Sequence, residues 1–176
     1  DRPRIDKNIL EKYHEGLIVC SACLGGEIPQ KIMAKKIAEA DEAIKWFKNL
    51  FGEDFYIEIQ RHQTDKPASD TQVFERQQQI IPTLLSLAEK NNVKVIATND
   101  VHFVEEEHAE AHDRLICLST GRKLTEENRM HYTKQEWLKT PEEMFQIFKD
   151  IPQALENTQE IVDKVEFFSI DADPLM

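Results

Sequence analysis

Three short runs of apolar and β-branched residues along the chain predict buried strands. They cover 17–20, 55–60 and 93–98, and polar or glycine-containing segments separate them. Over 29–50 and 71–91, apolar residues instead recur at the three- and four-residue spacing of a helix that packs on one side. The order strand, helix, strand, helix, strand predicts parallel strands joined by crossover helices, and hence an α/β fold.

Helix-ending residues refine these elements. Asp6 is placed to cap a short helix over 6–15. Gly52 ends the helix over 29–50, which we expect to be continuous. Pro82 either kinks the following helix or divides it in two.

The last third of the chain has a different pattern. A helix is predicted over 105–119, with acidic residues in its first turn, where the helix dipole favours them. Residues 122–140 show no periodicity and are predicted to be irregular. Thr140 and Pro141, followed by two glutamates, are typical of a helix start. They open a helical hairpin that we expect to run to about Lys164.

Composition narrows the class of protein. With 40% hydrophobic and 31% charged residues, the chain is typical of a soluble globular domain. No stretch approaches the ~18 to 20 apolar residues of a membrane span. Three cysteines are too few for a disulfide framework and suit a reducing cytoplasm. A net charge of −11 repels phosphate, which argues against this surface gripping nucleic acid.

Asp100 and His102 follow the third predicted strand. Alternate residues of an extended segment point the same way, so both side chains would project from the carboxyl end of that strand. This edge of α/β folds is where sites are built, and the two donor types suit zinc, manganese or iron. In the alternative interpretation, Asp100 caps the helix that starts near residue 105 and His102 is a packed loop residue.

Other candidates are less specific. Cys23 follows the first strand and as a thiolate could be a third ligand, although a buried apolar thiol is the commoner role. His108 and His112 are four apart and share a helix face, but an exposed acidic face with one buried histidine is the alternative. Glu58 and His62, in and after the second strand, could line the same pocket or belong to a solvated polar face.

Five blocks of sequence together resemble the bacterial DNA polymerase III alpha subunits. They are G-L-I-V-C-S-A-C-L-G-G-E-I-P at 16–29, F-Y-I-E-I-Q-R-H at 55–62, V-I-A-T-N-D-V-H-F at 95–103, the A-E-A-H block at 109–123 and the P-E-E-M block at 141–161. The resemblance runs in order from about residue 4 to about residue 165. It implies a PHP (polymerase and histidinol phosphatase) domain, a distorted (β/α)7-type barrel with a metal cluster at its carboxyl edge.

The resemblance also implies roles for particular residues. Cys23, Asp100 and His102 fall on three of the family's metal-ligand positions. Family members that keep this site can be metal-dependent and can act as 3′–5′ proofreading exonucleases. One departure is Ala22, which stands where the family usually has glycine.

Two further family motifs are not found in this sequence. The H-x-H motif that opens a PHP domain, with the ligand motifs that follow it, would lie before Asp1. The acidic triad of the polymerase would lie after Met176. Both ends are therefore expected to be internal to a longer protein. No catalytic residue for polymerisation is expected in this chain, which alone should neither polymerise nor hold the full cluster.

We therefore predict a partial PHP-type (β/α)7 barrel with parallel strands over 1–139 and a helical segment over 140–176 that leads toward the polymerase core. The expected cofactor of the intact protein is a divalent metal, namely zinc, manganese or magnesium. The expected partners are DNA, nucleotides and replisome subunits such as the sliding clamp and the proofreading subunit, with no membrane. Open sheet edges would favour self-association of the chain. A stand-alone PHP phosphoesterase and a non-enzymatic replisome interaction module are the alternatives.

Overall fold

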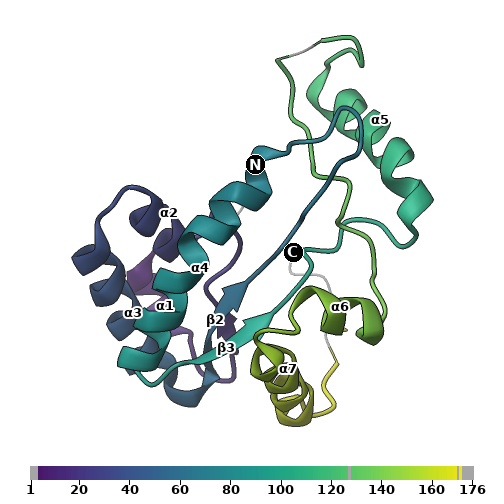
Figure 1. Ribbon diagram of the computed structural model, residues 1–176. Helices are drawn as coiled ribbons and strands as arrows, with labels where there is room; N and C mark the ends of the chain where they lie inside the picture. Colours follow the sequence, from purple (N-terminus) through teal and green to yellow (C-terminus); the bar gives the residue numbers. More distant parts are fainter. Residues whose placement is uncertain (1–3, 127, 170, 172–176) are drawn as a thin grey trace.

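Three parallel strands form the centre of the computed structural model, which describes residues 4–126, 128–169 and 171 (Figure 1). The strands are β1 (Val19–Cys20), β2 (Phe55–Ile59) and β3 (Lys94–Ala97), in the order β1-β2-β3. Because neighbouring strands are parallel, their carboxyl ends meet at one edge of the sheet. The predicted α/β order is confirmed, and the strands of the described residues form an open sheet rather than a closed barrel.

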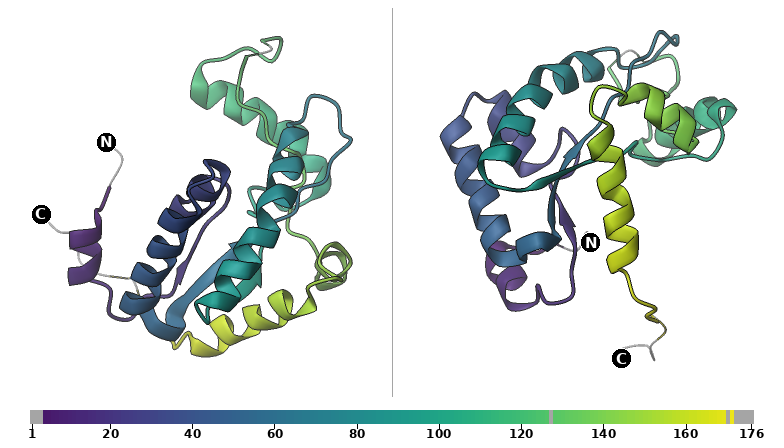
Figure 2. Two further views of the ribbon diagram at one scale, coloured as in Figure 1. Left: turned by 60° about the vertical axis from the view of Figure 1, so that its left-hand side comes forward. Right: turned by 60° about the horizontal axis from the view of Figure 1, so that its bottom comes forward.

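Helices cover the sheet from two sides. The helical elements are α1 (Lys7–Lys12), α2 (Glu27–Met33), α3 (Ile37–Phe51), η1 (Gly52–Asp54), α4 (Gln72–Lys90), η2 (Glu106–His108), α5 (Ala109–Thr120), α6 (Pro141–Ile147) and α7 (Pro152–Lys164). The right-hand view of Figure 2 shows α3 and α7 on opposite sides of the strands. The predicted caps at Asp6, Gly52 and Thr140 are confirmed.

The side chains of β2 alternate between two environments. Phe55, Ile57 and Ile59 lie in the hydrophobic core with residues of α3 and α4. Glu58 and Gln60 share the other side, where the Gln60 amide donates to the Glu58 carboxylate at 2.9 Å. That side is not solvated, because Gln60 is only 6% exposed. The alternation therefore separates an apolar core from a polar network near the carboxyl edge.

The prediction of one helix over 29–50 is wrong. The structure has α2 and α3 instead, with Lys35 between them at φ 60°, a left-handed conformation that ends the first helix. The break lets α2 and α3 pack against each other while Ile32 and Ile44 both reach the core. No glycine or proline marks this position, so tertiary packing outweighs the local helix preference.

Pro82 neither divides α4 nor ends it. Pro82 lies on the exposed face of α4, whereas Ile80, Ile81 and Leu84 are buried. The carbonyl that loses its helical hydrogen bond at Pro82 can therefore face water.

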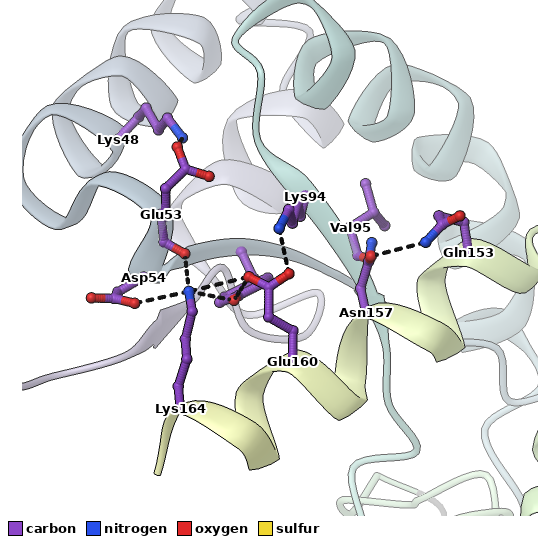
Figure 3. Close-up of polar contacts among 10 residues, drawn as sticks. Lys48, Glu53, Asp54, Lys94, Val95, Gln153, Asn157, Glu160 and Lys164 are labelled. Carbon is purple, nitrogen blue, oxygen red and sulfur yellow. Dashed lines mark hydrogen bonds and ion pairs between the residues drawn. The ribbon is translucent and has the colours of Figure 1, made fainter. Parts of the chain in front are cut away.

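The helical segment after Thr140 packs on the sheet. Asn157 of α7 donates to the carbonyl of Val95 in β3 at 2.8 Å, which satisfies a main-chain acceptor of this strand (Figure 3). Phe148 and Ala154 lie in the same core as β2. The division at 139/140 stays a prediction, and the ends of its two parts at Asp1 and Met176 lie outside the described residues. Over the part that the structure describes, no helix is long and apolar enough to span a bilayer.

Candidate functional site

Asp100 and His102 are close together beyond the carboxyl end of β3. Asp100 Oδ1 lies 3.6 Å from His102 Nε2, and both side chains are partly exposed. The segment is not extended as expected, because Asp100 has φ 45°, a left-handed conformation that aspartate tolerates better than most residues. The turn at Asp100, rather than strand alternation, therefore brings the two side chains together.

A second segment fixes this turn. The backbone N–H of His102 donates to the carbonyl of Glu136 at 2.8 Å, and that of Leu138 donates to Phe103 at 3.1 Å. The buried Asn99 amide adds bonds to the carbonyls of Gln135 and Trp137, both at 2.8 Å. The stretch around residue 136 was predicted to be irregular, and it lies beside the Asp100–His102 turn as a short parallel bridge.

Four rings gather on this turn. His102 lies 4.7 Å from Tyr132 and 5.5 Å from His112, between ring centroids. Phe103 lies 5.2 Å from His112. Burial, followed by the neighbouring His102, lowers the pKa of His112, which favours its neutral form. Sequence-predicted His112 therefore joins Asp100 and His102 in one cluster.

The Tyr132 phenol lies close enough to the candidate ligands for their charges to affect its pKa. Burial raises the pKa of Tyr132, and the charges of Asp100, Glu136 and Cys23 raise it further. These three groups therefore lie around the phenol, which keeps it protonated and able to donate a hydrogen bond at neutral pH. This places Cys23 in the neighbourhood of the cluster without making it a contact of Asp100 or His102.

The predicted His108–His112 pair is not a joint site. His108 lies at the start of the helix, where its Nδ1 accepts from the backbone N–H of Glu105 at 3.2 Å. His108 and Glu105 thus cap η2, the role that the alternative interpretation gave to Asp100. His112 is the member of the pair that turns toward the cluster.

His62 is buried, 3% exposed, and tied to internal partners through both ring nitrogens. Nδ1 lies 3.0 Å from the Gln77 amide nitrogen, and Nε2 lies 3.1 Å from the Asn99 carbonyl oxygen. Burial lowers the pKa of His62. Neither nitrogen is free to bind a metal, so His62 supports the site indirectly through the Asn99 backbone.

Glu58 belongs to a neighbouring polar network. Its Oε1 accepts from Thr98 Oγ1 at 2.5 Å, and its backbone N–H donates to Ser21 Oγ at 2.9 Å. Cys23 and Glu58 border one small cavity. This network joins the carboxyl ends of the three strands and leaves Glu58 half-buried.

The fit to a metal is partial. An aspartate oxygen and a histidine nitrogen are suitable donors, but two ligands are too few for tight binding. Within residues 4–126, 128–169 and 171, no three histidine, cysteine, aspartate or glutamate side chains converge closely enough to hold an ion. The described residues therefore do not complete a metal site, and the assignment of Cys23, Asp100 and His102 stays a prediction.

Sequence reasoning gave no role to two residues of this site, Tyr132 and Glu136. Glu136 is 2% exposed, and its carboxylate accepts from the backbone N–H and the hydroxyl of Thr133 at 3.0 and 2.6 Å. Both lie in a segment without periodicity, so no local signal identifies them.

Known proteins similar to this chain include a domain family and several polymerase subunits. The PHP domain family matches residues 1–62. DNA polymerase III subunit alpha of Borreliella burgdorferi is 43% identical over 171 residues, which is 96% of this chain and 14% of that protein. The Campylobacter jejuni and Helicobacter pylori (strain 26695) proteins of that name are 40% and 36% identical over 92% of this chain. The chain spans about 14% of the length of each of these relatives.

Proposed function

The chain belongs to the family of bacterial DNA polymerase III alpha subunits, and we propose that it forms part of the PHP domain of a cytoplasmic replicative DNA polymerase. In this proposal, the longer protein is a nucleotidyltransferase that acts in DNA replication. The observation that carries the proposal is the 43% identity over 96% of this chain. The matched span is long enough to include the strands, the Asp100–His102 turn and the α6–α7 segment.

The role proposed for the Asp100–His102 turn is metal binding in the intact subunit. The support is the proximity of the carboxylate and the imidazole at the carboxyl edge of a parallel sheet. Cys23, which borders the same polar network, is the third proposed ligand. Further ligands would have to come from residues outside this chain, since two or three donors do not hold a metal cluster.

Such a site can serve either 3′–5′ exonuclease activity or the structure of the polymerase. Hydrolysis of a phosphodiester needs an activated water and neutralisation of developing charge, which bound metal ions supply. The chain's own contribution is positioning: Asn99 and the backbone of Glu136 fix the turn, and the ring of Tyr132 packs against His102. We propose the exonuclease role first, because Asp100 and His102 remain partly exposed.

DNA, nucleotides and other replisome subunits are the proposed partners of the intact subunit. The net charge of −11 fits a module beside the duplex better than one that encloses it. A purely non-enzymatic role in subunit binding is the competing function. Exposed apolar side chains such as Leu115 and Leu118 of α5 give it a surface, but they do not identify a partner.

Metal analysis of the intact subunit tests the proposal. We expect bound divalent metal in the purified protein, most of it lost in His102→Ala. His108→Ala is the matched control, because this exposed histidine caps η2 instead of facing Asp100. Absence of metal from the wild-type subunit, or equal metal in His102→Ala, would remove the ligand assignments and favour a structural, partner-binding domain.

A second variant separates the two metal roles. In the intact subunit, Asp100→Asn keeps the size of the side chain but removes its charge. Loss of 3′–5′ exonuclease activity with retained polymerisation would support the catalytic role. Loss of polymerisation and of thermal stability together would instead indicate a structural metal.

A further inference from the structure

A cleft of about 630 Å³ has neither Asp100 nor His102 in its lining. It is formed by the connection after β2, the first turns of α4, the segment near residue 135 and α6. The residues that matter for its chemistry are Arg61, Gln63, Phe74, Gln78, Gln135 and Gln146. Its size is in the range of small-molecule sites, and its lining is rich in side-chain amides.

The four glutamine side chains are chemically available. In the part of the chain that the structure describes, none of these amides has a hydrogen-bond partner within the protein. Gln77 shows the contrast, because its amide oxygen and nitrogen both bond to buried His62, whereas its neighbour Gln78 lines the cleft. Each free amide can donate and accept at once, so together they suit a ligand that presents donors and acceptors side by side.

Charge argues for an uncharged ligand. Arg61 is committed to Asp150 through two bonds of 2.5 and 2.8 Å and to the carbonyl of Ile147 at 2.9 Å. Its guanidinium is therefore not available to grip a phosphate. The other charged group of the lining, Asp65, is an exposed carboxylate that repels anions.

The aromatic residue of the lining adds a flat surface. Phe74 is half-buried, so its ring can stack on a planar ligand. A primary amide pairs in bidentate fashion with the donor–acceptor edge of adenine. We propose that this cleft binds an unpaired nucleobase, with adenine preferred, held by glutamine amides and stacked on Phe74.

This site goes beyond the proposed function, since neither polymerisation nor a metal role of the Asp100–His102 turn requires it. An extended peptide is the other ligand that could satisfy amides. It is less suited, because the lining comes from four separate segments and includes no strand of the sheet to which a peptide could add. The base could belong to a free nucleoside or to a single strand.

Side-chain amide signals in a ¹H–¹⁵N NMR spectrum of the 176-residue chain, without added metal, test the proposal. Adenosine, AMP and a short oligo-deoxyadenylate are titrated separately. We expect saturable shifts of the Gln63, Gln78, Gln135 and Gln146 amides with adenosine. Weaker binding of AMP and the oligonucleotide would identify a nucleoside as the source, because of Asp65. Tighter binding of the oligonucleotide would identify a strand.

Substitutions in the cleft test whether the observed binding takes place there. The double variant Gln78→Ala/Gln146→Ala should weaken adenosine binding about tenfold, and Phe74→Leu by a similar factor. Gln79→Ala is the matched control, because Gln79 is exposed on the same helix but does not line the cleft. No saturable shift with any of the three probes would overturn the proposal. Equal shifts with a tetraglycine peptide would also overturn it, in favour of a peptide groove. Because no metal is involved, failure here leaves the polymerase assignment untouched.

Discussion

The side-chain amide of Gln77 holds the buried imidazole of His62 in one tautomer. The backbone N–H of His62 can only donate, and it does so to Gln77 Oε1 at 2.8 Å, which fixes the orientation of the amide. The Gln77 nitrogen must then donate to His62 Nδ1 at 3.0 Å. The proton of the neutral ring therefore sits on Nε2 and is donated to the Asn99 carbonyl. This chain of bonds joins α4 to the start of the Asp100–His102 turn.

Gln77→Leu should destabilise the protein clearly. Leucine fills a similar volume but leaves the buried backbone N–H and Nδ1 of His62 without partners. We expect a loss of about 2 to 4 kcal/mol in the free energy of unfolding. Urea unfolding followed by circular dichroism measures it. Gln79→Leu, on the exposed side of the same helix, should change stability by less than about 0.5 kcal/mol. Equal effects of the two substitutions would mean that the Gln77–His62 bonds contribute nothing.

The buried His62 also predicts a pH dependence. Burial lowers the pKa of His62 in the folded protein, so the unfolded chain binds a proton first as the pH falls below about 6.5. Stability should therefore fall between pH 6.5 and the lower folded pKa, by at most about 1.4 kcal/mol per pH unit.

Urea unfolding at pH 7.5 and pH 5.5 checks this slope against His62→Gln, which cannot titrate. We expect the wild-type protein to lose more stability on acidification than His62→Gln does. His108→Gln serves as the control, since this exposed residue should leave the wild-type slope unchanged. A wild-type slope equal to that of His62→Gln would contradict the assignment of a neutral, buried imidazole.

Local sequence signals predict the strands and most helix ends of this fold because the responsible interactions are local. Apolar runs mark β2 and β3, and Thr140 caps α6 through its own neighbour Glu143. The break at Lys35 escapes prediction, because the packing of α2 on α3 causes it and no breaking residue marks it.

The candidate site likewise has residues that the sequence predicts together and residues that it does not. Asp100 and His102 are two residues apart, so any turn or strand keeps them near each other, and sequence suffices to pair them. Tyr132 and Glu136 reach them because hydrogen bonds join two segments that are distant in the sequence. No periodicity encodes such a bridge. Asp100 also adopts a left-handed conformation that no local sequence signal marks.

Tyr56→Phe should loosen α7 without disturbing the core. The Tyr56 hydroxyl donates to Glu160 at 2.7 Å and accepts from Lys164 at 2.8 Å. Lys164 also bonds to Asp54 at 2.9 Å (Figure 3). A hydrogen bond from Lys94, followed by that from Tyr56, lowers the pKa of Glu160 to about 2, so the acceptor stays charged at neutral pH.

Loss of the hydroxyl should lower the free energy of unfolding by about 0.5 to 1.5 kcal/mol, since Glu160 and Lys164 still contact each other and water. Hydrogen exchange of the α7 amides should accelerate more than that of the α4 amides. Tyr13→Phe is the control, because Tyr13 is 63% exposed and should change neither quantity. Unchanged exchange in α7 of Tyr56→Phe would show that apolar packing alone holds this helix.

Two substitutions in the turn after β1, Ala22→Gly and Gly26→Ala, should change the free energy of unfolding in opposite directions. Ala22 is exposed with φ 64°, a left-handed conformation that alanine adopts at a cost of about 1 kcal/mol. Glycine adopts this conformation without that cost, so Ala22→Gly should raise the free energy of unfolding by about 0.5 to 1 kcal/mol. Ala34→Gly is the matched control, since Ala34 has an ordinary φ of −76° and should lose about as much as Ala22→Gly gains.

Gly26→Ala should destabilise, although its φ of −67° suits any residue. A Cβ at this position would lie 2.2 Å from the carbonyl oxygen of Ser21, so the backbone after β1 would have to move. Ser21 also accepts from the backbone of Glu58, and its displacement would disturb the polar network that Cys23 borders. We expect a loss of more than about 2 kcal/mol in urea unfolding. If Ala22→Gly destabilised the protein and Gly26→Ala did not, the conformation of this turn would be wrong, and with it the position of Cys23 beside the proposed metal site.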